Sequence, residues 1–338
     1  MKRLSAAIVA SAGVVVMGAC TDASRVVNPS TTVDLAPSYT QTPDNAQEKH
    51  IAFVPTKQKA DAERAARGKP GGGGTGISYH GGPVLQAGTK VVAIYWNATP
   101  IYNGGPAAGT TGAGTADGSL IGHFLRSLGG TPYFGINSTY KDGSGRAIVN
   151  SVAYTSYWAN NTSAPTGTQT ITDAQMIAML QSGINSGQIT YDASTLYLIF
   201  TAGQVNLGGG FGTQYCGYHT HGTVTDGGVS KVALYSAMPY DYGFPSACTN
   251  GTASPNGDPG ADGEVSVLAH EIEETTTDML GSAWFDNRGY ENADKCAWTF
   301  GTTYTTGNGG VANVNMGGKD FLVQRNWKNS GSGGCFML

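Results

Sequence analysis

The residues best suited to chemistry in this sequence are His270, Glu271 and Glu274. They lie in the run HEIEE, which an apolar-periodic stretch places on a helix. Residues four positions apart share one face of a helix, so His270 and Glu274 point toward one ion while Glu271 lies beside them. A histidine and a carboxylate so arranged predict a metal site, and zinc accepts both ligand types.

The spacing is similar to that of the His-Glu-x-x-His helix of zinc peptidases, in which the outer residues bind zinc and the inner Glu acts as a base. Here Glu274 replaces the second His, which shifts the preference somewhat toward harder metals. A third ligand is needed, and Glu291 resembles the later glutamate of thermolysin-type zinc peptidases. We therefore predict that His270, Glu274 and Glu291 bind zinc and that Glu271 is the general base.

Other side chains are candidates for orienting these ligands or replacing one. Asp278 lies ~12 Å along a helix from His270, too far to share its ion, so Asp278 or Asp294 would instead hold the His270 ring. His219 and His221 share one face of an expected strand and are suited to bind metal or substrate. The alternative is a surface pair beside a disulfide.

Composition affects how the acidic helix is interpreted. Glu-rich helices are often solvated, yet only 12% of this chain is charged, against about 25% in average domains. Acidic residues gathered over 264–278 therefore favour a site over a solvated face. The net charge of -4 predicts no nucleic-acid partner, and a serine hydrolase has no Gly-x-Ser-x-Gly motif to support it.

A turn-rich run precedes the helix and suggests a second ion. Asn256, Asp258 and Asp262 have the oxygen ligands and glycine-rich spacing of a calcium loop. Turn formation and capping of the following helix explain the same residues equally well. Calcium is therefore a candidate beside zinc.

The N-terminus predicts export. Residues 1–19 have a basic start, an apolar run and a small-residue exit, which together are typical of a signal peptide. Cys20 then resembles the lipidated cysteine of bacterial lipoproteins, the alternative being an ordinary signal peptide. Residues 20–75 are expected to form a flexible tether or propeptide. The prediction is a cell-envelope lipoprotein or a secreted protein that meets the membrane only through its lipid.

Four cysteines remain after Cys20, and an even number in an exported chain predicts two disulfides. We expect Cys216 to pair with Cys248 and Cys296 with Cys335, because these pairs close the shorter loops. A zinc site made of all four cysteines is the alternative, although the sequence has no Cys-x-x-Cys pair.

Hydrophobic patterns predict an α/β (α+β) fold in one domain over 76–338. Buried or half-buried strands are expected at 90–96, 146–158, 194–200, 215–224, 231–238 and 319–327, and helices at 119–128, 174–184 and 264–280. The order suggests a zincin-like domain with a mixed sheet, an active-site helix and a loop-rich C-terminal part. A polypeptide or cell-wall substrate would lie along an edge strand at 231–238, and we expect a monomer.

Several motifs resemble the phosphate-induced, EXORDIUM-like family of exported proteins. They are the runs YHGGPVL from Tyr79, CGYH from Cys216, SPNGDPGADG from Ser254 and TTTD ending at Asp278. The resemblance covers about 79–338 and implies an extracellular or wall-associated protein, with plant members linked to growth. The second functional hypothesis is accordingly a non-catalytic surface module for signalling or for binding glycans of the cell wall.

Overall fold

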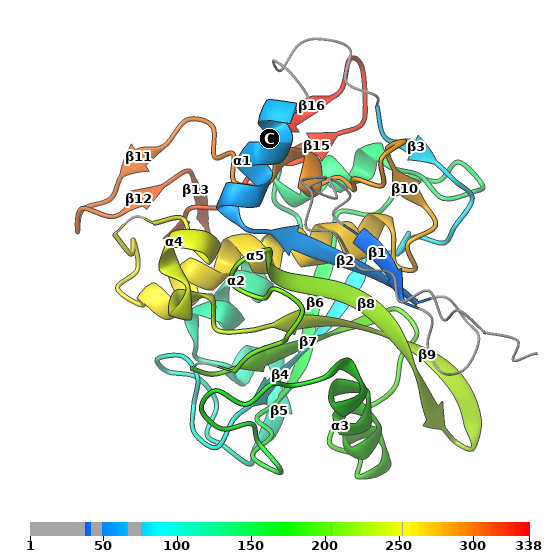
Figure 1. The fold of residues 1–338 in the computed structure, drawn as a ribbon, viewed down its shortest axis with the longest axis vertical. Helices are drawn as coiled ribbons and strands as arrows, with labels where there is room; N and C mark the ends of the chain where they lie inside the picture. Colours follow the sequence, from blue (N-terminus) through cyan, green and yellow to red (C-terminus); the bar gives the residue numbers. More distant parts are fainter. Residues whose placement is uncertain (1–37, 42–48, 67–75, 204, 252) are drawn as a thin grey trace, which may run out of the picture. The chain divides into compact units, whose positions relative to one another are not determined.

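One eight-stranded sheet organises the residues that the computed structural model describes, which are 38–41, 49–66, 76–203, 205–251 and 253–338. The strands run in the order β1-β2-β8-β9-β7-β4-β6-β5 (Figure 1). Their bounds are β1 Ser38–Gln41, β2 Lys49–Pro55, β4 Thr89–Trp96, β5 Thr111–Ala113, β6 Val152–Trp158, β7 Thr195–Thr201, β8 Tyr215–Asp226 and β9 Val229–Met238. The inner strands β9, β7, β4 and β6 pair in parallel, and the remaining pairs are antiparallel. The predicted α/β class with a mixed sheet is confirmed.

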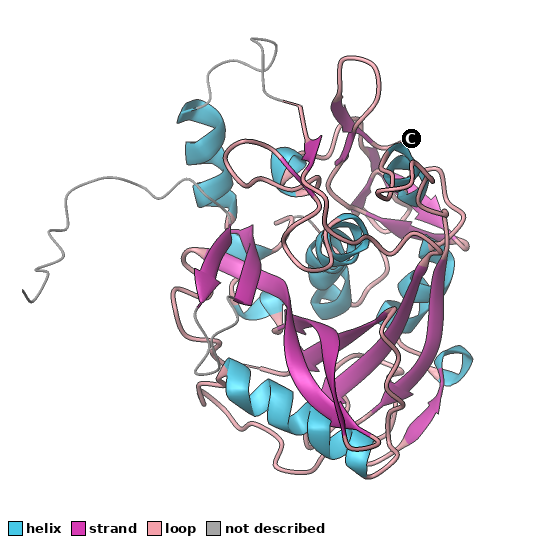
Figure 2. Ribbon diagram, turned by 90° about the vertical axis from the view of Figure 1, so that its right-hand side faces the viewer, coloured by secondary structure: helices cyan, strands magenta, loops and turns pink. Residues whose placement is uncertain are grey.

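Different helices cover the two faces of this sheet. Helices α5 (Pro259–Thr277) and α2 (Leu120–Leu128) pack on one face, and α3 (Asp173–Asn185) packs on the other. Figure 2 shows α5 nearly end-on above the sheet and α3 below it. Alternation along β4 follows this division, since Tyr95 belongs to the α5 side and Trp96 to the α3 side.

Most elements with a strong local pattern form where they are predicted. Strand β7 is buried along its whole length, as its continuous apolar run suggests. Helix α3 begins with a capping box, in which the Thr172 hydroxyl accepts from the Gln175 N–H and the Gln175 side chain accepts from the Thr172 N–H. Two expected strands are shorter, because β6 occupies only the second half of 146–158 and a loop interrupts 319–327.

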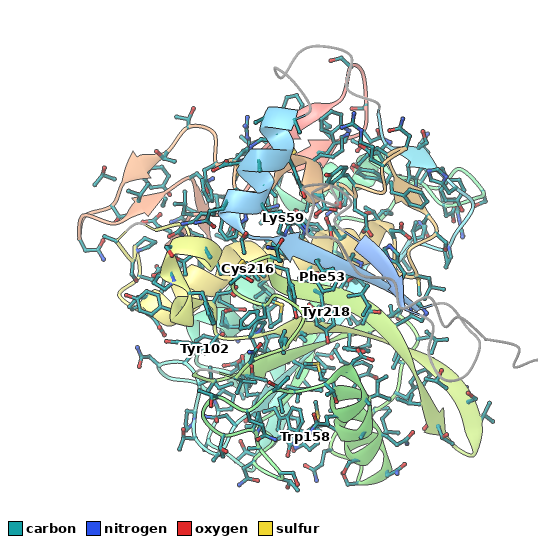
Figure 3. All side chains as sticks on the ribbon, viewed as in Figure 1. Phe53, Lys59, Tyr102, Trp158, Cys216 and Tyr218 are labelled. Atoms are coloured by element: carbon teal, nitrogen blue, oxygen red, sulfur yellow. A yellow bond between two sulfur atoms is a disulfide. The ribbon has the colours of Figure 1, made fainter. Side chains whose placement is uncertain are left out.

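The prediction that 231–238 is an edge strand is wrong. Strand β9 lies between β8 and β7 and is hydrogen-bonded on both sides. The outer side of β8 is covered by β2, with Phe53 opposite Tyr218, as the labelled side chains in Figure 3 show. Over Leu234–Met238 a peptide therefore has no free backbone to pair with on β9.

The segment 49–66, expected to be part of a flexible tether or propeptide, packs into the folded unit. Val54 of β2 is fully buried, and α1 (Lys57–Ala66) follows almost immediately. The Trp298 indole N–H donates to the Pro55 carbonyl at 2.7 Å, which ties this segment to the C-terminal part. The local pattern does not reveal this strand, because β2 joins the rest of the sheet only through β8, far along the chain.

The expected signal peptide, Cys20 and the other tether residues up to 37, 42–48 and 67–75 lie outside the described residues. The described part falls within one unit, 35–338. No helix in that part is long and apolar enough to cross a bilayer.

Short elements and two disulfides build the rest of the molecule. Four two-stranded hairpins or ribbons pair β3 (Ser78–Tyr79) with β10 (Trp284–Phe285), β11 (Tyr304–Thr305) with β12 (Val311–Ala312), β13 (Val314–Met316) with β14 (Lys319–Phe321), and β15 (Asn326–Lys328) with β16 (Gly334–Phe336). Helix α4 (Pro245–Cys248) and the 3-10 turns η1 (Gly114–Ala116), η2 (Phe134–Thr139), η3 (Asp241–Gly243) and η4 (Asp294–Cys296) complete it.

Cys216 bonds to Cys248 and Cys296 to Cys335, so the predicted pairing is confirmed and a four-cysteine zinc site is excluded.

Candidate metal centre

Helix α5 carries the candidate residues, and all of its residues from Gly260 to Thr277 are buried. Its N-cap is Asp258, whose carboxylate accepts the Ala261 N–H, and Pro259 opens the first turn. The helix therefore starts earlier than the expected residue 264. It also ends before the expected residue 280, at Thr277, where the last threonine hydroxyls bond back to carbonyls of the preceding turn.

Three side chains converge at the first of two adjoining groups. His270 Nε2 lies 2.9 Å from Glu274 Oε1 and 3.5 Å from Asp294 Oδ1. Glu274 Oε1 also accepts the backbone N–H of Asp294, which fixes the loop against the helix. Asp294 begins η4, and the Cys296–Cys335 disulfide anchors that turn two residues later. The spacing on α5 and the disulfide together position this group.

Gln324 holds the other side of the His270 ring. Its amide nitrogen lies 3.0 Å from His270 Nδ1 and donates to the Ala293 carbonyl at 3.0 Å. From the sequence, Asp278 or Asp294 is expected in this place. Gln324 was missed because it carries no charge and follows His270 by many residues in a loop without a motif.

The second group forms where α5 crosses β8. His219 Nδ1 lies 3.0 Å from Glu271 Oε2 and 3.7 Å from Glu274 Oε2, while its Nε2 lies 3.7 Å from Glu291 Oε2. Glu274 thus has one oxygen toward each group. The predicted ligand Glu291 lies closest to His219, and Asp294 takes the position beside His270.

Unpartnered polar atoms show that these residues suit a cation. The oxygens Glu274 Oε2, Asp294 Oδ1 and Glu271 Oε1 and both side-chain oxygens of Glu291 are buried without a hydrogen bond in the described part of the chain. His270 Nε2 faces two carboxylates without a hydrogen bond aligned to either. Buried charges are normally paired or bound to a metal. A divalent cation would satisfy these atoms, and nitrogen with carboxylate oxygen is a donor set that zinc accepts.

Sequence comparison gives a family for this site. Residues 130–329 match the family model of the phosphate-induced protein 1 conserved region. The chain belongs to the phosphate-induced protein 1 family. It is also 32% identical over 160 residues to Protein EXORDIUM-like 3 from Arabidopsis thaliana, a match that covers 40% of this chain. No solved structure matches the chain.

The match to the Arabidopsis relative covers 47% of that protein, so the chain spans about half of its length. The phosphate-induced protein 1 region contains β8, α5 and the loops that carry Glu291, Asp294 and Gln324. It does not contain β2 or β4. Both groups of candidate ligands therefore lie within the family region, whereas the strand that covers β8 lies outside it.

Burial sets the acid–base behaviour of these groups. It raises the pKa of Glu271 and of Glu291 well above the usual carboxyl range, and it raises the pKa of Glu274 to about 7, with Asp294 adding to the last shift. Burial opposes protonation of His270, but the carboxylates of Glu274 and Asp294 outweigh it and hold the His270 pKa well above its usual value. A bound cation would act against the rise of the carboxyl pKa values.

Two further histidines lie near the second group. His50 on β2 and His221 on β8 both interact electrostatically with His219. Burial, followed by the nearby His221, lowers the pKa of His50 to about 4. His50 was missed because residues 20–75 were interpreted as a tether. Four histidines from three elements thus gather around α5.

Asp278 does not approach His270. It is the C-cap of α5, and its Oδ1 accepts the backbone N–H groups of Ser282 and Ala283 at 2.6 and 2.7 Å. Its contacts close the loop that follows the helix. The expectation that it holds the His270 ring is therefore wrong, because the helix ends one residue earlier and its side chain points into that loop.

The residues of the expected calcium loop make turn and cap contacts. Asp258 accepts the N–H groups of Ala261 and Asn103. Asp262 accepts from Ser254 and from both nitrogens of Asn256. These are the contacts of the turn-and-cap alternative, and they direct the two carboxylates to different partners.

Proposed function

We propose that this protein is an exported, metal-dependent hydrolase that acts on polypeptides. The observation that carries the proposal is the buried convergence of His270, Glu274 and Asp294 with carboxylate oxygens that lack a hydrogen bond. The helical spacing resembles that of zincins, and a mixed sheet lies beneath the helix. The two disulfides favour an oxidising compartment, in keeping with the predicted export signal.

His270, Glu274 and Asp294 would hold the cation, and Glu291 approaches from the other side of Glu274. Zinc fits the nitrogen and oxygen donors, while the excess of carboxylates also suits a harder divalent metal. When bound, the ion supplies Lewis acidity toward the carbonyl of the scissile bond.

Glu271 is suited to the role of general base. Its Oε2 is held by His219 Nδ1 at 3.0 Å, and its Oε1 is free of hydrogen bonds in the described residues. Oε1 would accept a proton from water as the water oxygen attacks the carbonyl carbon. The same proton would pass to the amine nitrogen as the carbon–nitrogen bond breaks.

Access to this centre would require displacement of β2. His219 is 2% exposed, and the α5 side chains of the centre are fully buried. Strand β2 occupies the outer edge of β8, which is where an extended peptide would add to the sheet. We therefore place the substrate on β8, in the position of β2, and expect the intact chain to have low activity.

Metal analysis of the purified protein tests the site. We expect about one divalent ion per chain in the wild type and in Glu271→Gln, and loss of the ion in His270→Ala. His123→Ala is the matched control, because that histidine bonds to the Met316 carbonyl away from the centre. A wild type without stoichiometric metal would contradict the proposal at its first step.

Hydrolysis is then measured with casein, for the whole chain and for a chain that begins at residue 76. We expect the shorter chain to be more active and Glu271→Gln to abolish activity while keeping the metal. Bound metal with no hydrolysis in either form, when circular dichroism shows the shorter chain to be folded, would leave a structural metal site and exclude the hydrolase.

A further inference from the structure

A separate cavity lies on the opposite face of the sheet from α5. It has a volume of about 610 Å³ and lies between α3 and the ends of β4 and β6. Trp96 and Trp158 are the last residues of these two strands, which are parallel neighbours. Figure 3 shows Trp158 beside α3, on the side of the sheet away from α5. Ligands of open α/β sheets bind at the carboxyl ends of parallel strands, which is where this cavity lies.

The cavity has an apolar floor and a neutral polar rim. Its floor is formed by the buried rings of Trp96 and Trp158 together with Ile171 and Met179. Its lining carries five side-chain amides and several hydroxyl groups, and none of the residues that line it is ionisable. Burying a charged ligand here would be costly, because no opposite charge is present to compensate it.

Part of the rim has unused hydrogen-bonding groups. The amides of Asn161 and Gln188 are exposed and make no side-chain hydrogen bond within the described part of the chain. An amide both donates and accepts, so it matches a hydroxyl group, which does the same. Trp96 by contrast uses its indole N–H to bond the Thr162 carbonyl, which fixes the floor beneath the rim.

We propose that this cavity binds a neutral saccharide of one or two sugar units. The hydroxyl groups of the sugar would bond to the Asn161 and Gln188 amides, above the apolar floor. The volume is within the range of pockets that enclose small ligands. The site is independent of the proposed hydrolase, because the sheet separates it from the metal centre.

Calorimetric titration of the full chain tests this proposal with cellobiose, xylobiose and N,N′-diacetylchitobiose as neutral probes and digalacturonic acid as the charged probe. We expect at least one neutral disaccharide to bind saturably and the charged one to bind more weakly. The double variant Asn161→Ala/Gln188→Ala should weaken binding by about tenfold. Gln214→Ala, an exposed amide outside the cavity, is the control and should leave affinity unchanged.

Three results would overturn the proposal. They are no saturable binding of any neutral probe up to about 20 mM, tighter binding of digalacturonic acid, or equal affinity in wild type and double variant. Both substituted residues are exposed, so thermal unfolding by circular dichroism should show an unchanged fold. His270→Ala should retain sugar binding, which separates this test from that of the metal centre.

Discussion

Buried carboxyl groups continue beyond the metal centre along α5. Asp241 in η3 and Glu264 are both fully buried, and Glu264 Oε2 accepts the Asp241 N–H at 3.1 Å. Both oxygens of Asp241 and Oε1 of Glu264 have no hydrogen bond within the described residues. Burial raises the pKa of Glu264 to about 8, with the Asp241 N–H acting against that rise. The folded protein therefore favours the neutral acid.

This shift predicts a pH-dependent stability. A carboxyl pKa raised by folding contributes stability that is full below about pH 4.5 and is lost as the pH rises through 8. Glu264→Gln keeps an acceptor for the Asp241 N–H and removes the titration. Relative to wild type, we expect it to gain at least about 1.4 kcal/mol of unfolding free energy between pH 5 and pH 9. Urea unfolding of both proteins at the two pH values measures this difference. The same change in unfolding free energy for wild type and Glu264→Gln would contradict it.

The contact of Gln324 with the His270 ring should affect metal affinity. Gln324→Ala removes the group that holds the His270 ring, so we expect metal affinity to fall about 10–100-fold while the fold persists. Competition with a chelator measures the affinity, and Gln214→Ala serves as the control. An unchanged affinity would show that the ring is oriented by other contacts.

The sequence predicts the parts of this centre that follow from local geometry. His270 and Glu274 come together because a helix returns to the same face after four residues. Glu271 follows from the same helix, whereas its contact with His219 depends on how α5 crosses β8. Gln324 and His50 could not be found, because an uncharged amide in a loop and a histidine in an apparent tether have no local signal.

At the scale of elements, β2 and the loop after α5 depend on one glycine. Gly281 has a φ of +69°, and a Cβ there would lie 2.1 Å from Cγ of His50. Only a residue without a side chain allows the loop to pass under β2. Strand β2 is therefore matched to the C-terminal half in shape as well as in backbone pairing.

Gly281→Ala tests this packing against a matched variant. Gly257 also has a positive φ, of +76°, but a Cβ there meets no atom within 4 Å. Both variants lose the same backbone freedom, so we expect Gly257→Ala to cost about 1 kcal/mol and Gly281→Ala at least about 1 kcal/mol more. Chemical denaturation measures both, and equal costs would show that β2 does not press on this loop.

Elements with strong local patterns were also the ones that the sequence predicted. The apolar runs of β4 and β7 and the capped start of α3 suffice to locate them. The order of strands in the sheet has no such local signal, because it depends on which strands pair with one another. That is why β9 was expected at an edge although β8 and β7 enclose it.

At the scale of the whole molecule, the sheet separates an acidic, fully buried centre from a neutral, open cavity. In the absence of a cation the buried carboxyl groups of the acidic centre hold their protons more tightly, because burial and neighbouring carboxylates raise their pKa values. Binding a metal to the folded form alone would therefore couple metal concentration to global stability.

Chelation should reveal this coupling. We expect EDTA to lower the wild-type Tm by several degrees, since a ligand at one hundred times its Kd adds about 2.7 kcal/mol. Readdition of zinc should restore the Tm, and His270→Ala should respond to neither treatment. A wild-type Tm that is indifferent to both would contradict a metal bound at this centre.

The position of β2 also bears on how the molecule is made. Its partner β8 follows after most of the sheet, with Ile51 opposite Thr220. This early strand must therefore wait for a late one, and pairing between such distant segments slows folding. During that interval the β8 edge is open to strands of other chains, and the arrival of β2 is the event that ends this exposure to aggregation.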